Sequence, residues 1–353
     1  MVYLTRSINI RTFIYALATF TLVVLIIPLI IRLCNKNHWY DKINSRKIHT
    51  GDIPRLGGVG FTLCFLLVGS VYLLRAHPEF FIRTVPIFIS AIIVFVMGVV
   101  DDFRDLRART KLIGQCVASL IPVLFGFQFT QFGPIHLGFA GKIITFIWFV
   151  GLTNALNLID GIDALCGSIS LSILLTLGAV LQLRGNSDYT ALLFILSAAV
   201  LGFLVYNKPK AKIFMGDGGS QFLGFMIAAF PLFKNAPELD YNMFPMIVVL
   251  VSIPILDTFA AIWRRTREGR SFFSPDKMHL HHKLLNMGYT SLSILGLLVV
   301  IQVGLCVLSL IVMLWIDGLR GSLVLFVALL AMIIFFSIIH YTSHAIKRLK
   351  KEV

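Results

Sequence analysis

Acidic residues lie at the ends of apolar segments in this chain. The stretch GVVDDFRDLRART at 98–110 places Asp101 and Asp102 side by side directly after an apolar run. Adjacent carboxylates repel each other, and one takes up a proton unless a cation lies close by. Three arginines and Lys111 follow, and they could neutralise these acids at an ordinary helix end. The pair therefore predicts either a cation site or a charge-balanced helix terminus.

A second polar stretch, NALNLIDGIDALCG at 154–167, has a helical period. Two amides and two carboxylates recur there at every third position: Asn154, Asn157, Asp160 and Asp163. This spacing puts them on one helix face. No Lys or Arg lies between Lys142 and Arg184, so neighbours in sequence cannot neutralise the acids. Such a stripe suits a sugar, a phosphate or a metal, with simple helix capping as the alternative.

The third stretch, KPKAKIFMGDGGSQFLG at 208–224, is rich in glycine around Asp217. Glycines allow a ligand to come close to the backbone, and the start of the following helix offers free N–H groups to an anion. The stretch lacks the Gly-Lys-Ser/Thr of a nucleotide-binding P-loop. It predicts an anion or metal site, or else a turn that Asp217 caps.

The fourth stretch, WRRTREGRSFFSPDKMHLHHKL at 263–284, is basic. It holds four arginines, two lysines and three histidines, among them Arg265, His279, His281 and His282. Arginine makes two-pronged contacts with phosphate. An anion site is therefore expected here, although a solvated basic loop would also explain the composition.

The composition identifies the setting of these four stretches. The chain has 353 residues, of which 58% are hydrophobic and only 14% charged. Soluble domains are about 45–50% apolar, so this is an integral membrane protein. Apolar runs of the length that crosses a bilayer as helices predict an all-α polytopic fold with about eleven spans: 13–33, 56–74, 84–100, 112–127, 142–158, 166–183, 189–206, 218–233, 241–262, 291–316 and 321–344.

Lysine and arginine are distributed unevenly between the two sides. If the N-terminus is outside, the inner loops and the C-terminal tail hold 23 of the 31 Lys and Arg residues. The positive-inside rule therefore predicts the N-terminus outside and the C-terminus in the cytoplasm. Residues 1–353 are expected to form a single transmembrane domain in which 263–290 is a cytoplasmic basic loop. Topology explains the charge, so nucleic-acid binding is not expected.

An ion-coupled transporter of a phosphorylated solute is the alternative from another class. Transporters place ionisable groups near the middle of the bilayer and often show internal repeats. Nearly every acid here lies at the end of a span, and Asp257 is the exception. No pair of similar halves is evident either. Both observations argue against a transporter, and the position of the acids favours a site on the cytoplasmic face.

Six stretches resemble one known family in sequence and order. They are RKIHTGDIPRLGGVG, VVDDFRDL, NALNLIDGID, MGDGGSQFLG, PILDT and GRSFFSPDKMHLHHKL. They resemble the polyprenyl-phosphate N-acetylhexosamine-1-phosphate transferases of glycosyltransferase family 4. The HLHH sequence is similar to the bacterial branch that transfers GlcNAc-1-phosphate to undecaprenyl phosphate. Ala164 departs from the glycine usual in this family.

The resemblance implies a reaction in the bacterial inner membrane that starts cell-envelope glycan synthesis, such as that of lipopolysaccharide, O-antigen or teichoic acid. UDP-HexNAc, most simply UDP-GlcNAc, and undecaprenyl phosphate would give undecaprenyl-diphosphate-HexNAc and UMP with Mg²⁺, for which Mn²⁺ could substitute. Transfer of phospho-MurNAc-pentapeptide in peptidoglycan synthesis is the alternative within the family. A homodimer is also implied.

The same resemblance assigns roles to the polar residues. The expected metal ligands are Asp217, Asp102 and Asn157. The expected catalytic residues are Asp101, Asp102, Asp160, Asp163 and His279, with one of the adjacent pair near the metal and the other acting as a base. The expected substrate-binding residues are Lys47, His49, Arg55, Asn154, Asn157, Arg265, His281 and His282.

Overall fold

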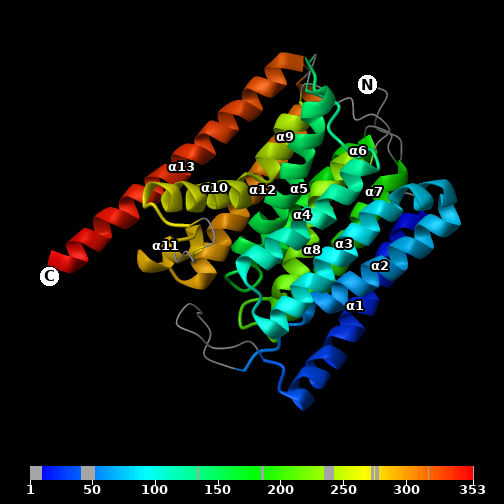
Figure 1. The fold of residues 1–353 in the computed structure, drawn as a ribbon, viewed down its shortest axis with the longest axis horizontal. Helices are drawn as coiled ribbons and strands as arrows, with labels where there is room; N and C mark the ends of the chain where they lie inside the picture. Colours follow the sequence, from blue (N-terminus) through cyan, green and yellow to red (C-terminus); the bar gives the residue numbers. More distant parts are fainter. Residues whose placement is uncertain are drawn as a thin grey trace.

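The protein is a bundle of long helices (Figure 1). The computed structural model describes residues 10–40, 52–132, 135–183, 187–233, 242–271, 274, 278–316 and 318–352. The helices are α1 (Ile10–Asn37), α2 (Gly57–Ala76), α3 (Pro78–Arg104), α4 (Ala108–Leu124), α5 (Gly138–Ile159), α6 (Leu165–Leu183), α7 (Ser187–Asn207), α8 (Gly216–Ala229) with the 3₁₀ turn η1 (Phe230–Leu232), α9 (Met243–Leu250), α10 (Ser252–Arg267), α11 (Leu280–Asn286), α12 (Ser291–Trp315) and α13 (Gly318–Glu352). One short hairpin, β1 (Gln131–Phe132) with β2 (Ile135–His136), is the exception among the described residues.

All eleven predicted runs are largely helical, which confirms an all-α polytopic membrane protein. Eight helices are long and apolar enough to cross a membrane, and the bent pair α9–α10 could make a ninth. The 17 residues of α4 and the 14 of α8 are too few for this test. By length and composition, the described residues thus support eight or nine spans and not the eleven expected.

The predicted span 241–262 is not one continuous helix. It breaks at Val251, and α9 and α10 meet there at 70°. Pro254 has no N–H to donate to the carbonyl of Leu250, so the helical ladder is interrupted at the break. In Figure 1, α9 follows the direction of the bundle while α10 runs across it. The second half of this run also continues as helix to Arg267, into the segment that was expected to be a loop.

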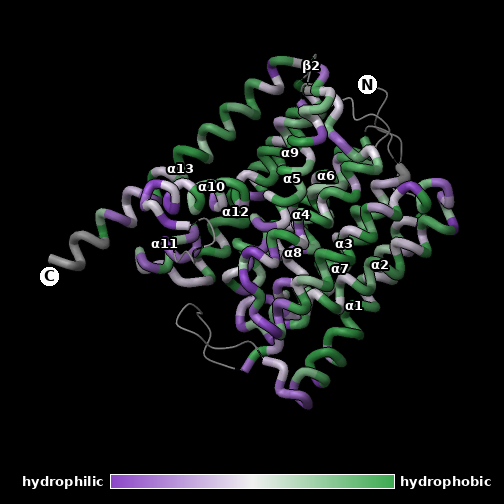
Figure 2. The backbone as a smooth tube through the Cα atoms, in the orientation of Figure 1, coloured by the Kyte–Doolittle hydropathy of each residue, from purple (hydrophilic) through white to green (hydrophobic). Residues whose placement is uncertain are grey.

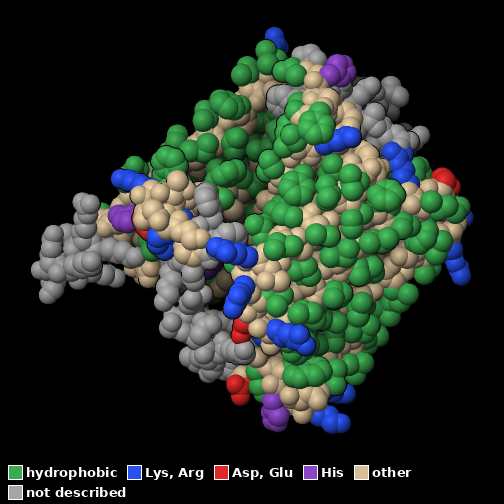
Figure 3. Space-filling model, viewed as in Figure 1, with side chains coloured by type: hydrophobic (Ala, Val, Ile, Leu, Met, Phe, Trp, Pro, Cys, Tyr) green, Lys and Arg blue, Asp and Glu red, His purple; other side chains and the backbone are tan. Residues whose placement is uncertain are grey.

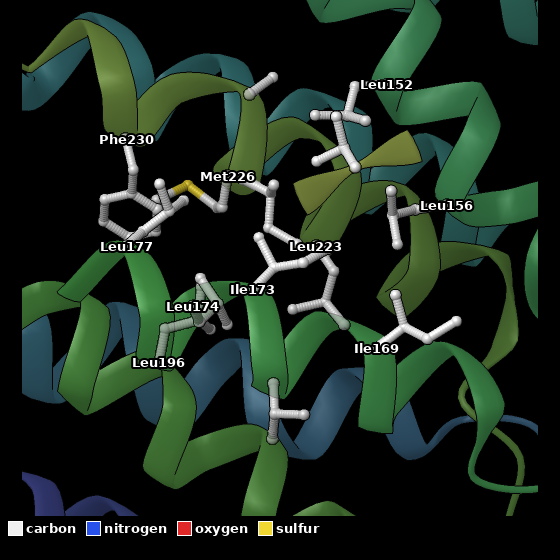
Figure 4. Packing of buried hydrophobic residues seen from close by; sticks show 14 of the residues in the cluster. Leu152, Leu156, Ile169, Ile173, Leu174, Leu177, Leu196, Leu223, Met226 and Phe230 are labelled. Carbon is white, nitrogen blue, oxygen red and sulfur yellow. The ribbon is translucent and has the colours of Figure 1, made fainter. Parts of the chain in front are cut away.

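The helices α5, α6, α7 and α8 enclose the apolar core. Figure 4 shows Leu156 of α5, Ile173 of α6, Leu196 of α7 and Leu223 of α8 pointing toward one another. Each of these four side chains is fully buried. A helix that is apolar on all sides can pack some of these residues against its neighbours and turn the others to lipid.

The outside of the bundle is also apolar, as a lipid-facing surface requires. Hydrophobic side chains cover most of the face shown in Figure 3, and Lys and Arg gather near its edges. Hydrophilic residues concentrate at one end of α3, α4 and α8 and around α11 (Figure 2). These are the ends at which the acidic and basic stretches of the sequence lie.

Glycines bring α2, α3 and α8 into backbone contact. A Cβ added at Gly98 would lie 2.5 Å from the Cα of Gly218 and 2.6 Å from the carbonyl oxygen of Asp217. A Cβ added at Gly58 would lie 2.4 Å from the Cα of Gly219. Small residues let membrane helices approach this closely. The start of α8 is therefore fixed between α2 and α3.

Candidate active site

Asp102 joins the end of α3 to the start of α8. Its carboxylate accepts hydrogen bonds from the backbone N–H of Asp217 at 3.0 Å and of Gly218 at 3.2 Å. Both belong to the first turn of α8, whose N–H groups have no partner within the helix. A carboxylate at this position also faces the positive end of the helix dipole. Asp102 is 4% exposed, so the predicted residue lies inside the protein.

Lys111 on α4 connects two of the predicted acids. Its ammonium group forms ion pairs with Asp101 and with the Oδ2 atom of Asp217, the latter at 2.8 Å. The other oxygen of Asp101 accepts the backbone N–H of Leu106 at 2.6 Å. One cation thus holds together carboxylates from α3 and α8, 116 positions apart in sequence. Sequence reasoning treated Lys111 only as a neutralising charge and missed this role.

The amides of α5 face the same region. The hydroxyl of Ser220 donates to Asn157 Oδ1 at 2.7 Å. Asn154 donates to Gln115 Oε1 at 2.5 Å, and Gln115 in turn donates to Gln221 Oε1 at 3.0 Å. Asn157 therefore lies beside the first turn of α8. Asn154 lies one turn before Asn157 on α5. It belongs to a chain of hydrogen-bonded amides, with Gln115 and Gln221, that sequence reasoning did not foresee.

Asp160 and Asp163 differ in their surroundings. Asp160 directly follows α5 and is half-buried. Asp163 Oδ2 accepts the backbone N–H groups of Lys210 at 3.1 Å and of Ala211 at 3.0 Å. Asp163 therefore holds the loop that leads into α8. Ala164, the departure from the usual glycine, has φ of +63°, so the loop keeps a left-handed conformation that glycine adopts at lower cost.

Arg55 lies beside the glycine-rich turn. The backbone of 54–58 pairs with that of 214–215, through Phe214 N–H to the carbonyl of Pro54 at 2.7 Å and Gly57 N–H to the carbonyl of Phe214 at 2.9 Å. This pairing brings Arg55 close to the carboxylate of Asp102. Lys47 and His49, also expected to bind phosphate, fall outside the described residues.

The histidine stretch is anchored by Asp257 of α10. His279 Nδ1 lies 2.8 Å from Asp257 Oδ2, and the backbone N–H of Leu280 donates to Asp257 Oδ1 at 2.8 Å. Asp257 is 1% exposed and His279 is 6% exposed. Sequence reasoning noted Asp257 as an acid within an apolar run and as part of the PILDT stretch, but gave it no role. The structure places it in contact with a predicted catalytic residue.

The three histidines lie next to one another. The rings of His279 and His281 are parallel with centroids 6.2 Å apart, and those of His281 and His282 are 4.2 Å apart. Burial, helped by the neighbouring His282, lowers the pKa of His281 to about 3. His281 is therefore neutral at physiological pH and can offer a hydrogen bond, but no positive charge, to a substrate. Arg265 lies near the end of α10 and is half-buried.

His281 also connects the histidine stretch to the end of α5. A Cβ added at Gly161 would lie 2.3 Å from His281 Nε2 and 2.5 Å from its Cε1. Gly161 follows Ile159 and Asp160 and comes two positions before Asp163, in the acidic turn at the end of α5. The imidazole therefore packs directly against this turn. Two of the predicted stretches are thereby held in contact, although 120 positions separate Gly161 from His281.

Replacing Gly161 with alanine is expected to disturb this contact. The new methyl group would overlap a buried imidazole ring, and overpacking of this kind costs about 1–3 kcal/mol. We expect a lower melting temperature and a reduced turnover, because His279 and the acidic turn shift together. Gly151→Ala is the matched control, since a Cβ at Gly151 meets nothing within 4 Å. Equal melting temperatures and turnover for the two variants would contradict the contact.

Comparison with known proteins shows which family the chain resembles. The model of "Glycosyl transferase family 4" matches residues 84–234. A probable undecaprenyl-phosphate N-acetylglucosaminyl 1-phosphate transferase of Bacillus subtilis (strain 168) is 33% identical over 75% of this chain and 75% of its own. A decaprenyl-phosphate N-acetylglucosaminephosphotransferase of Mycobacterium tuberculosis (strain CDC 1551 / Oshkosh) is 34% identical over 70% and 69%.

The undecaprenyl-phosphate alpha-N-acetylglucosaminyl 1-phosphate transferase of Escherichia coli (strain K12) is 30% identical over 71% of this chain and 70% of its own. Each of these relatives matches more than two thirds of the chain, and about a third of the aligned positions are identical. The matched segment 84–234 holds the joined ends of α3, α4, α5 and α8. The chain belongs to glycosyl transferase family 4.

Proposed function

We propose that this protein transfers GlcNAc-1-phosphate from UDP-GlcNAc to undecaprenyl phosphate. An oxygen of the lipid phosphate attacks the phosphorus next to the sugar, the diphosphate bond of the nucleotide breaks, and UMP leaves. The products are undecaprenyl-diphosphate-GlcNAc and UMP, and the lipid product starts a cell-envelope glycan. The activities for which the relatives are named support the reaction. The observation that supports it most on this chain is the pairing of Asp101 and Asp217 through Lys111.

The residues at this position fit a divalent cation. Two carboxylates lie against the ammonium group of Lys111, and the amide of Asn157 lies beside one of them, Asp217. Mg²⁺ takes one or two carboxylates and fills its remaining positions with phosphate oxygens and water. The described residues contain no group of three or more His, Cys, Asp or Glu side chains arranged for a metal, so substrate oxygens and water would have to complete the coordination. Asp217, Asn157 and one of Asp101 and Asp102 would hold Mg²⁺ or Mn²⁺, which supplies charge neutralisation when bound.

The remaining roles concern positioning and charge. In phosphoryl transfer most of the catalysis comes from orienting the groups and offsetting their charge. Both reactants are anions, so Lys111, Arg55 and Arg265 offset their repulsion. Asp101 or Asp102 accepts the proton of the lipid phosphate. Asp163 holds the loop before α8. The other expected residues of the described part hold the nucleotide sugar: Asn154, Asp160, His279, His281 and His282. Lys47 and His49, outside the described residues, help to anchor phosphate.

The orientation in the membrane follows from the charge distribution. We place the N-terminus outside and the C-terminus in the cytoplasm of a bacterial inner membrane, with the chain in a single transmembrane domain and the site on the cytoplasmic face. The segment 263–290 extends into the cytoplasm, with α11 and the end of α10 within it. A homodimer is expected by analogy with the family.

Release of UMP tests the proposal directly. Purified protein with UDP-GlcNAc, undecaprenyl phosphate and Mg²⁺ should release UMP, EDTA should stop the reaction, and excess Mg²⁺ or Mn²⁺ should restore it. UDP-MurNAc-pentapeptide in place of UDP-GlcNAc should give no product. Asp217→Asn should lose activity and need more Mg²⁺ for what remains. Solute uptake into proteoliposomes without consumption of a nucleotide sugar would instead support a transporter.

A further inference from the structure

Asp257 and His279 form a buried pair that connects α10 to α11. Each carboxylate oxygen of Asp257 has its own partner, since Oδ2 faces His279 Nδ1 and Oδ1 accepts the N–H of Leu280, both at 2.8 Å. Both side chains are more than nine-tenths buried. Residues 22 positions apart are thus held in one fixed geometry.

The N-terminus of α11 depends on this carboxylate. Leu280 is the first residue of α11, and the preceding residue, His279, makes no capping hydrogen bond with its own side chain. Ser, Thr, Asp and Asn usually cap a helix from the residue just before it. Here the acceptor comes from another helix, so the position of α11 is fixed relative to α10.

The same carboxylate determines which ring nitrogen of His279 carries a proton. An ionised carboxylate only accepts hydrogen bonds, so Nδ1 must donate. Nε2, on the opposite edge of the ring, is then the nitrogen left for a substrate. In enzymes that use histidine, a partner at one nitrogen fixes the tautomer and orientation of the ring.

We propose that Asp257 is a positioning residue that fixes His279 so that Nε2 faces the phosphates of the nucleotide sugar. This inference rests on the proposed function. Asp257 itself does not touch the substrate. It acts through His279 and, separately, holds the start of α11.

Two substitutions separate these two roles. In Asp257→Asn the amide oxygen can still accept the N–H of Leu280, while the NH₂ group now faces His279 Nδ1. Two donors cannot pair, so Nδ1 must become an acceptor and the proton moves to Nε2. Asp257→Ala removes both contacts. Asp257→Asn should therefore keep the melting temperature near that of the native protein, whereas Asp257→Ala should lower it.

Turnover in a double-mutant cycle gives the main test. Asp257→Asn should lower kcat/KM for UDP-GlcNAc at least about tenfold, a part of the roughly 100- to 10,000-fold that a positioned acid–base group contributes. In the His279→Ala background the same change should have no further effect, because the residue through which it acts is absent. A merely structural role would give effects that multiply, as for independent sites, and that outcome would overturn the proposal. Thr258→Val is the matched control on α10, since its hydroxyl donates to the carbonyl of Pro254 in the same helix.

A spectroscopic measurement is independent of the reaction. In protein labelled with ¹⁵N-histidine, the His279 signals are those lost in His279→Ala. They should report the Nδ1–H form, or a doubly protonated ring, in the native protein and the Nε2–H form in Asp257→Asn. An unchanged tautomer in Asp257→Asn would overturn the proposal even in a protein of another activity. Absence of UMP release by the native protein would instead contradict only the proposed function.

Discussion

Lys111→Met is expected to lower turnover about 100- to 1000-fold, the usual cost of removing one well-placed electrostatic contact from an active site. The ammonium group joins Asp101 and Asp217. Without it, two carboxylates face each other with no cation of the protein between them. The turnover number measured with UDP-GlcNAc and undecaprenyl phosphate at saturating Mg²⁺ checks this prediction.

Two further variants distinguish a loss of charge balance from a loss of folding. Lys111→Met should also lower the melting temperature, because breaking a buried ion pair leaves an unpaired charge. Adding Asp101→Asn should recover much of the melting temperature but none of the turnover. Lys142→Met is the control, since Lys142 is exposed near the start of α5. Turnover of Lys111→Met within about threefold of the native value would contradict the bridging role assigned on the basis of these contacts.

Gly98→Ala is expected to have a large effect for a single added methyl group. The new Cβ would lie 2.5 Å from Gly218 Cα and 2.6 Å from the carbonyl oxygen of Asp217, both backbone atoms of α8. A backbone cannot move aside as a flexible side chain does, so α3 and α8 must separate. Overpacking costs about 1–3 kcal/mol, and a displacement of about 1 Å in an active site can cost about 100-fold in rate.

Thermal unfolding and turnover together check the Gly98 prediction. We expect a lower melting temperature and a loss of turnover larger than the loss of folded protein explains. Gly304→Ala on α12 adds the same methyl group where nothing lies within 4 Å, and it should behave as the native protein. Native turnover in Gly98→Ala would show that the contact between α3 and α8 does not set the geometry of the site.

Much of the fold could be predicted from hydropathy, because the thickness of the bilayer sets the length of the apolar run that a spanning helix needs. The break at Val251 could not. The run around it is mostly apolar, and Pro254 is the local signal that lies next to the break. Pro28 and Pro86 lie inside helices that continue past them, so a proline alone does not predict a break. Packing of α10 against other elements decides the outcome, and packing is not visible in a local sequence.

The acids of the site could be predicted because they stand out in an apolar chain. Their partners could not. Lys111 is one of several basic residues after Asp102, and only the fold shows which of them reaches Asp217. Asp257 was visible, but its partner lies 22 positions away, beyond a helix end. Likewise, Asp163 looked like part of the substrate stripe, yet it accepts two backbone N–H groups from the loop before α8.

The bonds from Asp102 to the first turn of α8 also restrict how substrates can be admitted. If α3 and α8 parted, a carboxylate and two amide groups would lose their partners in a place largely closed to water. Each such loss costs about 1–3 kcal/mol. We therefore expect the seam between these two helices to stay shut during catalysis, and any opening motion that lets a lipid tail or a nucleotide enter to take place in other parts of the chain.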